Sequence, residues 1–126
     1  MCIRDRLVSI ALVNNEIGTV QDLAAISDLC RDAGAILNSD FAQAPSAVCL
    51  LEYADLADMV SLSGHKFGGP MGVGALYVSR ELKDRIEPLF HGGGQEGGLR
   101  SGTLPLPLCV GPVSYTHLTL PTIYSV

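Results

Sequence analysis

LVSIALVNNEIGTVQDLAAISDLCRDAGAILNSD, residues 7–40, carries in succession the patterns of a strand, a helix and a second strand. Residues 7–13 (LVSIALV) form a continuous apolar run, which is typical of a strand buried on both faces. Residues 14–18 then have the chemistry of a turn. A strand, a helix and a strand joined by short connections make a βαβ unit, and such units build parallel sheets with right-handed crossovers.

The helix of this unit is predicted to begin after Thr19, which suits the N-cap position, with Asp22 three residues further on. Gly34 suits the C-terminal cap. Between these two ends, apolar residues recur at helical spacing: Leu23, Ile26, Leu29, Cys30 and Ala33. Residues 35–38 are expected to form the second strand, which ends at residues 39–40.

Toward the C-terminus the same kind of organisation continues. Residues 50–57 predict a short helical or irregular connection, which leads to a third strand at residues 58–62. A fourth strand is predicted at residues 73–78. Ser79 is expected to cap one more short helix, which Pro88 limits.

The predicted architecture is an α/β segment with a mostly parallel sheet and flanking helices over residues 7–111. Eleven of the fourteen glycines lie within residues 64–102, so loops with close backbone approaches are expected there. Residues 1–6 and 112–126 do not continue the pattern. We expect these two ends to be non-native or artefactual and to have no function.

Composition narrows the possible classes of function. The chain has 126 residues, of which 48% are hydrophobic and 17% charged, as in one ordinary folded domain. Eight basic and thirteen acidic side chains give a formal charge of −5, which argues against nucleic acid or an anionic membrane as the main partner. No apolar run approaches the roughly 20 residues of a spanning helix, and residues 1–6 carry charges but no apolar stretch long enough for a secretory signal. Four separated cysteines without a CxxC pair are typical of reduced cytosolic thiols.

Polar side chains follow each of the first three predicted strands. Asn15 follows the first strand, Asp40 closes the second, and Ser63, His65 and Lys66 follow the third. In open α/β sheets, ligands bind beyond the carboxyl ends of the strands, where loops from separate strands converge. The sequence therefore predicts one convergent site.

The residue types of this site fit one cofactor. Lys66 lies beside His65 in a glycine-rich loop, and a neutral lysine amine attacks an aldehyde to form a Schiff base. Pyridoxal 5'-phosphate supplies such an aldehyde, together with a ring that acts as an electron sink. Asp40 is the candidate that keeps the pyridine nitrogen protonated, and Gln43 is the candidate donor to the ring oxygen. The phosphate needs several donors, for which Ser63, His65 and the adjacent loop amides are candidates.

Five stretches of the chain together carry a family resemblance: residues 13–18 (VNNEIG), 39–44 (SDFAQA), 61–66 (SLSGHK), 72–78 (GVGALYV) and 91–103 (HGGGQEGGLRSGT). In this order and register they resemble the cysteine desulfurases of the NifS/IscS type. These are class V aminotransferase-family enzymes of fold type I that use pyridoxal phosphate. The resemblance implies that the chain is an internal fragment of their large, cofactor-binding domain.

The resemblance also implies a role for each residue around the cofactor ring. Lys66 would be the Schiff-base lysine and would move the proton of the substrate's Cα. Asp40 would be the partner of the pyridine nitrogen, and Gln43 would bond the ring hydroxyl oxygen. Asn15 would lie near the cofactor and the substrate carboxylate.

The implied phosphate ligands come from two places in the chain. Ser63 and His65 would hold the phosphate within one subunit, and Thr103 would reach the phosphate of the other subunit in a homodimer. A metal site is not expected, because His65, His91 and the scattered cysteines lack ligand spacing.

The reaction implied by the resemblance removes sulfur from L-cysteine and gives L-alanine and an enzyme persulfide. The persulfide then feeds iron–sulfur cluster assembly and sulfur transfer, with acceptors such as an iron–sulfur scaffold protein. Neither Cys30, Cys49 nor Cys109 matches the family's nucleophile motif. The chain on its own is therefore expected to be inactive.

Other classes of function stay open beside this one. Within the family, the alternatives are a selenocysteine lyase or another class V aminotransferase-like enzyme. An inactive fragment or interaction piece is the alternative of another class. Residues 91–94 (HGGG) resemble the oxyanion loop of esterases, but a hydrolase also needs a Gly-x-Ser-x-Gly elbow, which does not occur. GxxxxGK[ST] is likewise absent, so a nucleotide-binding module is not favoured.

Overall fold

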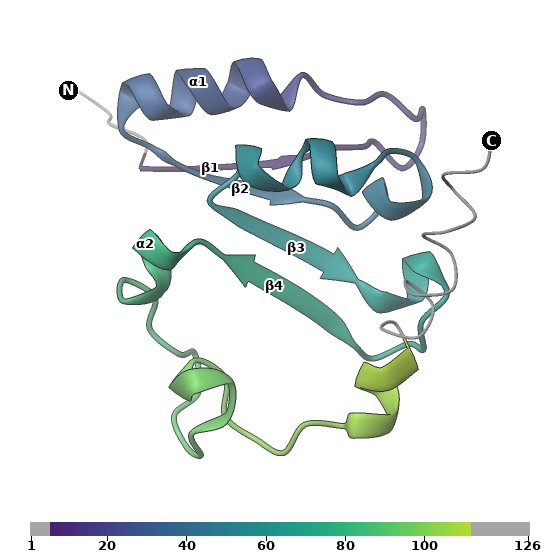
Figure 1. Cartoon of the computed structure of the whole chain (residues 1–126), viewed down its shortest axis with the longest axis vertical. Coiled ribbons are helices and arrows are strands. Elements are labelled where there is room, and N and C mark those ends of the chain that lie inside the picture. The colour runs from purple at the N-terminus through teal and green to yellow at the C-terminus, as the bar shows by residue number, and fades with distance from the viewer. Residues whose placement is uncertain (1–5, 112–126) are drawn as a thin grey trace.

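A four-stranded sheet is the central feature of the computed structural model, which describes residues 6–111 (Figure 1). The strands lie side by side in chain order: β1 (Leu7–Ala11), β2 (Ile36–Asp40), β3 (Met59–Ser63) and β4 (Gly74–Val78). All four predicted strands are confirmed, with ends that differ from the predicted ones by two residues at most.

The directions of the strands follow from the lengths of their connections. β1, β2 and β3 run parallel, and β4 runs antiparallel to β3. A parallel pair needs a crossover of about a dozen residues or more, and residues 64–73 between β3 and β4 are too few for one. The prediction of a mostly parallel sheet is confirmed, and the short connection accounts for its one reversed strand.

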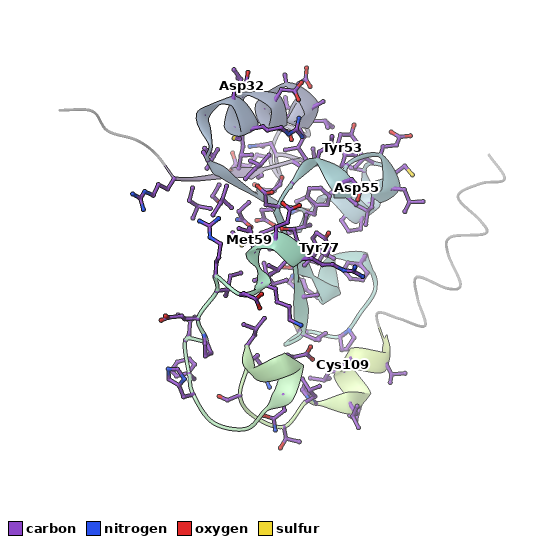
Figure 2. The ribbon with its side chains drawn as sticks, turned by 60° about the vertical axis from the view of Figure 1, so that its left-hand side comes forward. Asp32, Tyr53, Asp55, Met59, Tyr77 and Cys109 are labelled. Atoms are coloured by element: carbon purple, nitrogen blue, oxygen red, sulfur yellow. The ribbon has the colours of Figure 1, made fainter. Side chains whose placement is uncertain are left out.

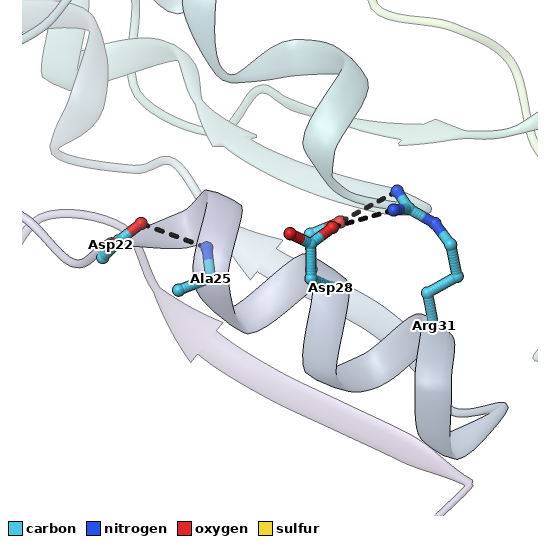
Figure 3. A network of polar contacts seen from close by, with 5 residues as sticks. Asp22, Ala25, Asp28 and Arg31 are labelled. Carbon is cyan, nitrogen blue, oxygen red and sulfur yellow. Dashed lines mark hydrogen bonds and ion pairs between the residues drawn. The ribbon is translucent and has the colours of Figure 1, made fainter.

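Helix α1 (Leu23–Ala33) connects β1 to β2, and its N-cap is Asp22 rather than the predicted Thr19. Asp22 Oδ1 accepts a hydrogen bond of 3.1 Å from the backbone N–H of Ala25 (Figure 3). Thr19 instead accepts a 2.9 Å hydrogen bond at its carbonyl from the N–H of Asn14. The predicted cap is wrong because this pairing keeps the chain extended for three more residues.

The other end of α1 is as predicted. Gly34 has φ 65°, in the left-handed region, and its N–H donates a 3.1 Å hydrogen bond to the carbonyl of Arg31. Glycine adopts this conformation without the Cβ clash that other residues suffer. The predicted glycine cap is therefore confirmed.

The hydrophobic core lies between α1 and one face of the sheet. Its buried members come from β2, β3, α1 and the connections that follow the strands: Leu12, Val13, Leu23, Cys30, Leu37, Phe41, Ala44, Ala57 and Val60. The helix does not extend over the outer strand β4, since Tyr77, the register partner of Val60, is 51% exposed (Figure 2).

The second face of the sheet is not covered by the described residues. Residues of β1 alternate between half-buried and exposed side chains, and Leu7 is 54% exposed. The prediction that this apolar strand is buried on both faces is therefore wrong for the described part of the chain. An apolar run indicates which strand belongs in a core but not whether a second layer is present to bury it.

The C-terminal half is mostly irregular, as its glycine content predicts. It contains the short helix α2 (Arg80–Lys83) and the 3-10 helix η5 (Gln95–Gly98). Ser79 occupies the N-cap position of α2 as predicted, but its side chain makes no capping hydrogen bond. No helix within residues 6–111 is long and apolar enough to cross a membrane. The predictions about the two ends concern residues that lie almost entirely outside the described ones.

Candidate functional site

The carboxyl ends of β2 and β3 bring most of the predicted residues to one edge of the sheet. Asp40 is the last residue of β2, Ser63 is the last residue of β3, and the two strands are parallel neighbours. The 3-10 helix η1 (Ala44–Ser46) follows β2 and packs against the 3-10 helix η4 (Gly64–Phe67), which follows β3. The connection that begins with Asp40 and the turn that carries Lys66 are therefore in contact.

Asp40 has one carboxylate oxygen fixed and one open. Its Oδ1 accepts hydrogen bonds from the N–H of Ala42 at 2.8 Å and from the hydroxyl of Ser61 at 3.1 Å. Its Oδ2 has no hydrogen-bond partner among the described residues. The side chain lies on the uncovered face of the sheet and is exposed. A carboxylate of this kind is oriented by the protein and still able to accept a hydrogen bond from a ligand.

Ser61 is a further candidate site residue, which no motif in the sequence indicated. It is the register partner of Asp40, so the two side chains project from the same face of adjacent strands. The spacing between Ser61 and Ser63 offered a signal, since residues two apart on a strand share a face. Without the register, nothing in the sequence connected Ser61 with Asp40.

The turn that carries Lys66 is tightly closed by its glycines. The N–H of Gly64 donates a 3.0 Å hydrogen bond to the carbonyl of Val73, and the N–H of Gly69 donates a 2.9 Å bond to Gly64. Gly68 ends the turn in the left-handed region with φ 87°. His65 and Lys66 are exposed on this turn.

The candidate phosphate donors in this turn differ in how free they are. Among the loop amides around Gly64, the amide of Gly64 itself is already bound to the carbonyl of Val73. Ser63 is better placed to donate, because it occupies the N-cap position of η4 while its hydroxyl makes no capping hydrogen bond. Gln43 directly precedes η1 and is half-buried, with its carbonyl accepting a 3.1 Å hydrogen bond from Ser46.

The two adjacent asparagines after β1 have different roles. Asn14 Oδ1 accepts hydrogen bonds from the N–H groups of Glu16 at 2.9 Å and Ile17 at 3.0 Å, so Asn14 forms the turn. Asn15 is exposed, and its side chain makes no hydrogen bond with the described residues. Asn15, the candidate from the sequence, is therefore the one that is not occupied in holding the turn.

Thr103 lies apart from the other predicted residues along the chain and in the fold. It is exposed on the irregular segment that follows η5, which lies beyond the outer strand β4, on the side away from β3 (Figure 1). Asp40 lies on β2, with β3 between it and β4. The structure brings together the residues after β2 and β3, and it leaves Thr103 outside that group.

The described cysteines do not gather at this edge. Cys30 is buried on the core-facing side of α1, Cys49 is exposed before a short 3-10 turn, and Cys109 lies on the last described segment. Figure 2 shows Cys109 at the opposite end of the molecule from Asp32 of α1. Within residues 6–111, no group of three His, Cys, Asp or Glu side chains could hold a metal ion.

The fold and the strand-end residues define an α/β protein with a candidate site at the carboxyl edge of its sheet, and the comparison with known families assigns the chain to one family. The family model described as Aminotransferase class-V matches residues 3–106, so the chain belongs to the class-V aminotransferase family. It is 52% identical over 105 residues to the cysteine desulfurase IscS of Rickettsia rickettsii (strain Iowa), and 51% identical to the cysteine desulfurase IscS of Shewanella baltica (strain OS155 / ATCC BAA-1091). Each match covers 83% of this chain and 26% of the relative. The chain thus spans about a quarter of the length of these curated relatives.

Solved structures share the fold. A structure of SspA in complex with cysteine matches with a TM-score of 0.78 and 43% identity, over 88% of this chain and 32% of SspA. The crystal structure of DndA from Streptomyces lividans matches with a TM-score of 0.75 and 42% identity, over 89% of this chain and 32% of DndA. These matches confirm both the resemblance read from the sequence and the predicted α/β fold.

Proposed function

We propose that this chain supplies part of the cofactor site of a cysteine desulfurase that uses pyridoxal phosphate. The observation that carries the proposal is the oriented carboxylate of Asp40 at the end of β2, next to the turn of Lys66 at the end of β3. The names of the relatives support the reaction, which takes sulfur from L-cysteine and leaves L-alanine and an enzyme persulfide.

The side chains at this edge fit the chemistry of the cofactor. When bound, pyridoxal phosphate supplies an aldehyde that condenses with amines and a protonated pyridine ring that withdraws electrons. The edge offers one amine, one carboxylate with an open oxygen, and a hydroxyl that is not used for capping. These are the three kinds of group that the aldehyde, the ring nitrogen and the phosphate require.

Asp40 is proposed to hold the proton of the pyridine nitrogen. Its open Oδ2 would accept that N–H, while Ser61 and the N–H of Ala42 keep Oδ1 in place. A hydrogen bond between a cationic N–H and a carboxylate is about twice as strong as a neutral one. The negative charge of Asp40 therefore keeps the ring in its electron-withdrawing form.

Lys66 is proposed to bind the aldehyde carbon through Nζ and, when its amine is free, to move a proton at the substrate's Cα. Its exposed position on a short, glycine-closed turn leaves the amine accessible to a ligand. Gln43 is proposed to bond the ring oxygen, and Asn15 to lie near the cofactor and the substrate carboxylate.

The remaining roles concern the phosphate and the assembly. Ser63 and His65 are proposed to bind the phosphate from the same subunit, and Thr103 to bind the phosphate of the other subunit of a homodimer. The proposed sulfur acceptors include an iron–sulfur scaffold protein, in the cytoplasm. Since none of the described cysteines matches the nucleophile motif, the 126-residue chain is proposed to bind the cofactor without turning over cysteine.

The chain provides its own control for a test of the cofactor site, because Lys66 and Lys83 are its only lysines. Pyridoxal phosphate is added, the visible spectrum is recorded, and borohydride reduction is followed by mass-spectrometric mapping. Both lysines are exposed, so non-specific reaction would label both of them. The proposal expects the label on Lys66, and its loss in Lys66→Ala but not in Lys83→Ala. Equal labelling of the two lysines, or none, would refute it.

The reaction itself is tested in a protein that includes the remainder of the relatives' length. L-cysteine is expected to release alanine in amounts equal to the sulfur transferred to an added thiol. Substrate preference for selenocysteine over cysteine would instead favour a selenocysteine lyase.

A further inference from the structure

The polar loop that contains Thr103 is held by side chains from its own segment. Gln95 Oε1 accepts a 3.2 Å hydrogen bond from the N–H of Gly102, and Arg100 Nη1 donates a 2.9 Å hydrogen bond to the carbonyl of Gly102. Gly102 has φ 102°, a conformation that favours glycine. Both backbone polar groups of Gly102 are thus fixed directly before Thr103.

Two glycines of the run 92–94 make room for these contacts. A Cβ at position 93 would overlap the Gln95 side-chain amide, at 2.8 Å from Nε2, and a Cβ at position 92 would lie 2.9 Å from the Cβ of Ser101. A Cβ at Gly94 would meet nothing within 4 Å, and Gly94 has φ −81°, which any residue adopts. The glycines at 92 and 93 therefore serve the approach of the 100–103 loop, and Gly94 does not.

The backbone just after Gln95 is also strained. Glu96 has φ 50° and ψ 39°, the left-handed conformation that a residue with a Cβ rarely adopts. Such strain persists where the surrounding contacts fix the backbone. The contact between Gln95 and Gly102 is one such constraint.

We propose that Gln95 is a positioning residue: its side-chain amide holds the loop of residues 100–103 in the shape that presents Thr103 to the cofactor phosphate of the other subunit. The hydrogen bond between Gln95 and Gly102 and the space left by Gly93 are observed in the structure of this chain. The phosphate as the group that Thr103 meets rests on the proposed function.

The hydrogen bond is tested by amide hydrogen exchange of Gly102 in the 126-residue chain, measured by NMR. Gln95→Ala removes the acceptor, and Gly93→Ala displaces the flexible Gln95 amide, so each is expected to speed exchange at Gly102 about five-fold. The double variant Gly93→Ala/Gln95→Ala is expected to exchange at the same rate as Gln95→Ala, because the Cβ added at position 93 then has no Gln95 amide to displace. Gly94→Ala is the matched control and is expected to leave the rate unchanged. The amide of Gly64, bonded to Val73, is the internal reference for any general loosening of the fold.

The link to the phosphate is tested by comparing the dissociation constants of pyridoxal phosphate and of pyridoxal, which lacks the phosphate. Gln95→Ala is expected to weaken the binding of pyridoxal phosphate about five-fold and to leave the binding of pyridoxal unchanged. Gly94→Ala is expected to bind both compounds like the wild type. An unchanged exchange rate at Gly102 in Gln95→Ala would overturn the positioning role. So would a double variant whose Gly102 amide exchanges faster than in either single variant. Faster exchange with unaltered phosphate selectivity overturns the link to the phosphate. Failure of the wild type to label at Lys66 overturns the proposed function and the phosphate link with it, while the exchange result still decides the role of Gln95 in the loop.

Discussion

The hydroxyl of Ser61 donates a 3.1 Å hydrogen bond to Oδ1 of Asp40, across two parallel strands on which these residues are register partners. The pairing of β2 with β3 therefore sets the orientation of the carboxylate. Since β3 also leads directly into the turn of Lys66, one strand aligns both halves of the proposed cofactor site. The hydrogen bond is the most specific connection between the fold and the proposed chemistry.

Removing this hydrogen bond is expected to weaken cofactor binding. Ser61→Ala leaves the carboxylate of Asp40 with one fewer donor on Oδ1, and a hydrogen bond to a charged group contributes about 1.5 kcal/mol or more, or roughly ten-fold in affinity. The measurement is a spectroscopic titration with pyridoxal phosphate. Ser9→Ala is the control, because Ser9 accepts a hydrogen bond from Asn38 on the same face of the sheet but does not contact Asp40. Equal affinities of the two variants would contradict the role of Ser61.

Neutralising the carboxylate is expected to cost more than removing its neighbour. Asp40→Asn keeps the size of the side chain but loses the charge-assisted hydrogen bond to the ring nitrogen, which we expect to weaken pyridoxal phosphate binding about 30-fold. Asp55→Asn, an equal change of charge at an exposed position in the 3-10 helix η3 (Ala54–Leu56), serves as the control. Titrations of both variants at several salt concentrations separate a local effect from a change in net charge. An Asp40→Asn protein with the affinity of the Asp55→Asn protein would rule out the proposed contact.

The strands and the main helix could be predicted because their apolar patterns reflect a local choice between periods of 2 and 3.6 residues. The direction of β4 was also within reach, since its connection is too short for a crossover. The N-cap of α1 was not, because Thr19 is held by a hydrogen bond from Asn14 that depends on how the turn folds back on itself. Burial of Leu7 depends on a second layer over the sheet, and a single strand's sequence cannot report that layer.

Candidate site residues could be predicted where strand ends carry polar side chains, as at Asp40 and Ser63. The support for Asp40 could not, because it depends on the register that places Ser61 opposite it. Likewise, the sequence treats Asn14 and Asn15 alike, and only the turn's hydrogen bonds tell them apart. In each case the missing information is a contact that forms only on folding, either between two strands or across a turn.

The cap of α1 offers a direct comparison between the predicted and the observed residue. Asp22→Ala removes the acceptor for the N–H of Ala25 and is expected to lower the free energy of unfolding by about 1 kcal/mol. Thr19→Ala keeps the backbone carbonyl that receives the hydrogen bond from Asn14, so its effect is expected to stay within about 0.5 kcal/mol. Urea unfolding of the two variants measures both values. A larger loss in Thr19→Ala than in Asp22→Ala would reverse the assignment of the cap.

Gly34 and Gly94 allow the cost of left-handed backbone to be measured without steric interference. A Cβ at either position meets no atom within 4 Å, but Gly34 has φ 65° and Gly94 has φ −81°. Gly34→Ala is therefore expected to lower the free energy of unfolding by about 1 kcal/mol, because alanine is disfavoured in the left-handed region. Gly94→Ala is expected to raise it by about 0.5 kcal/mol, because alanine reduces the entropy of the unfolded chain and fits the native conformation. Urea unfolding of both variants is the measurement, and effects of the same sign would show that the backbone conformation does not control the difference.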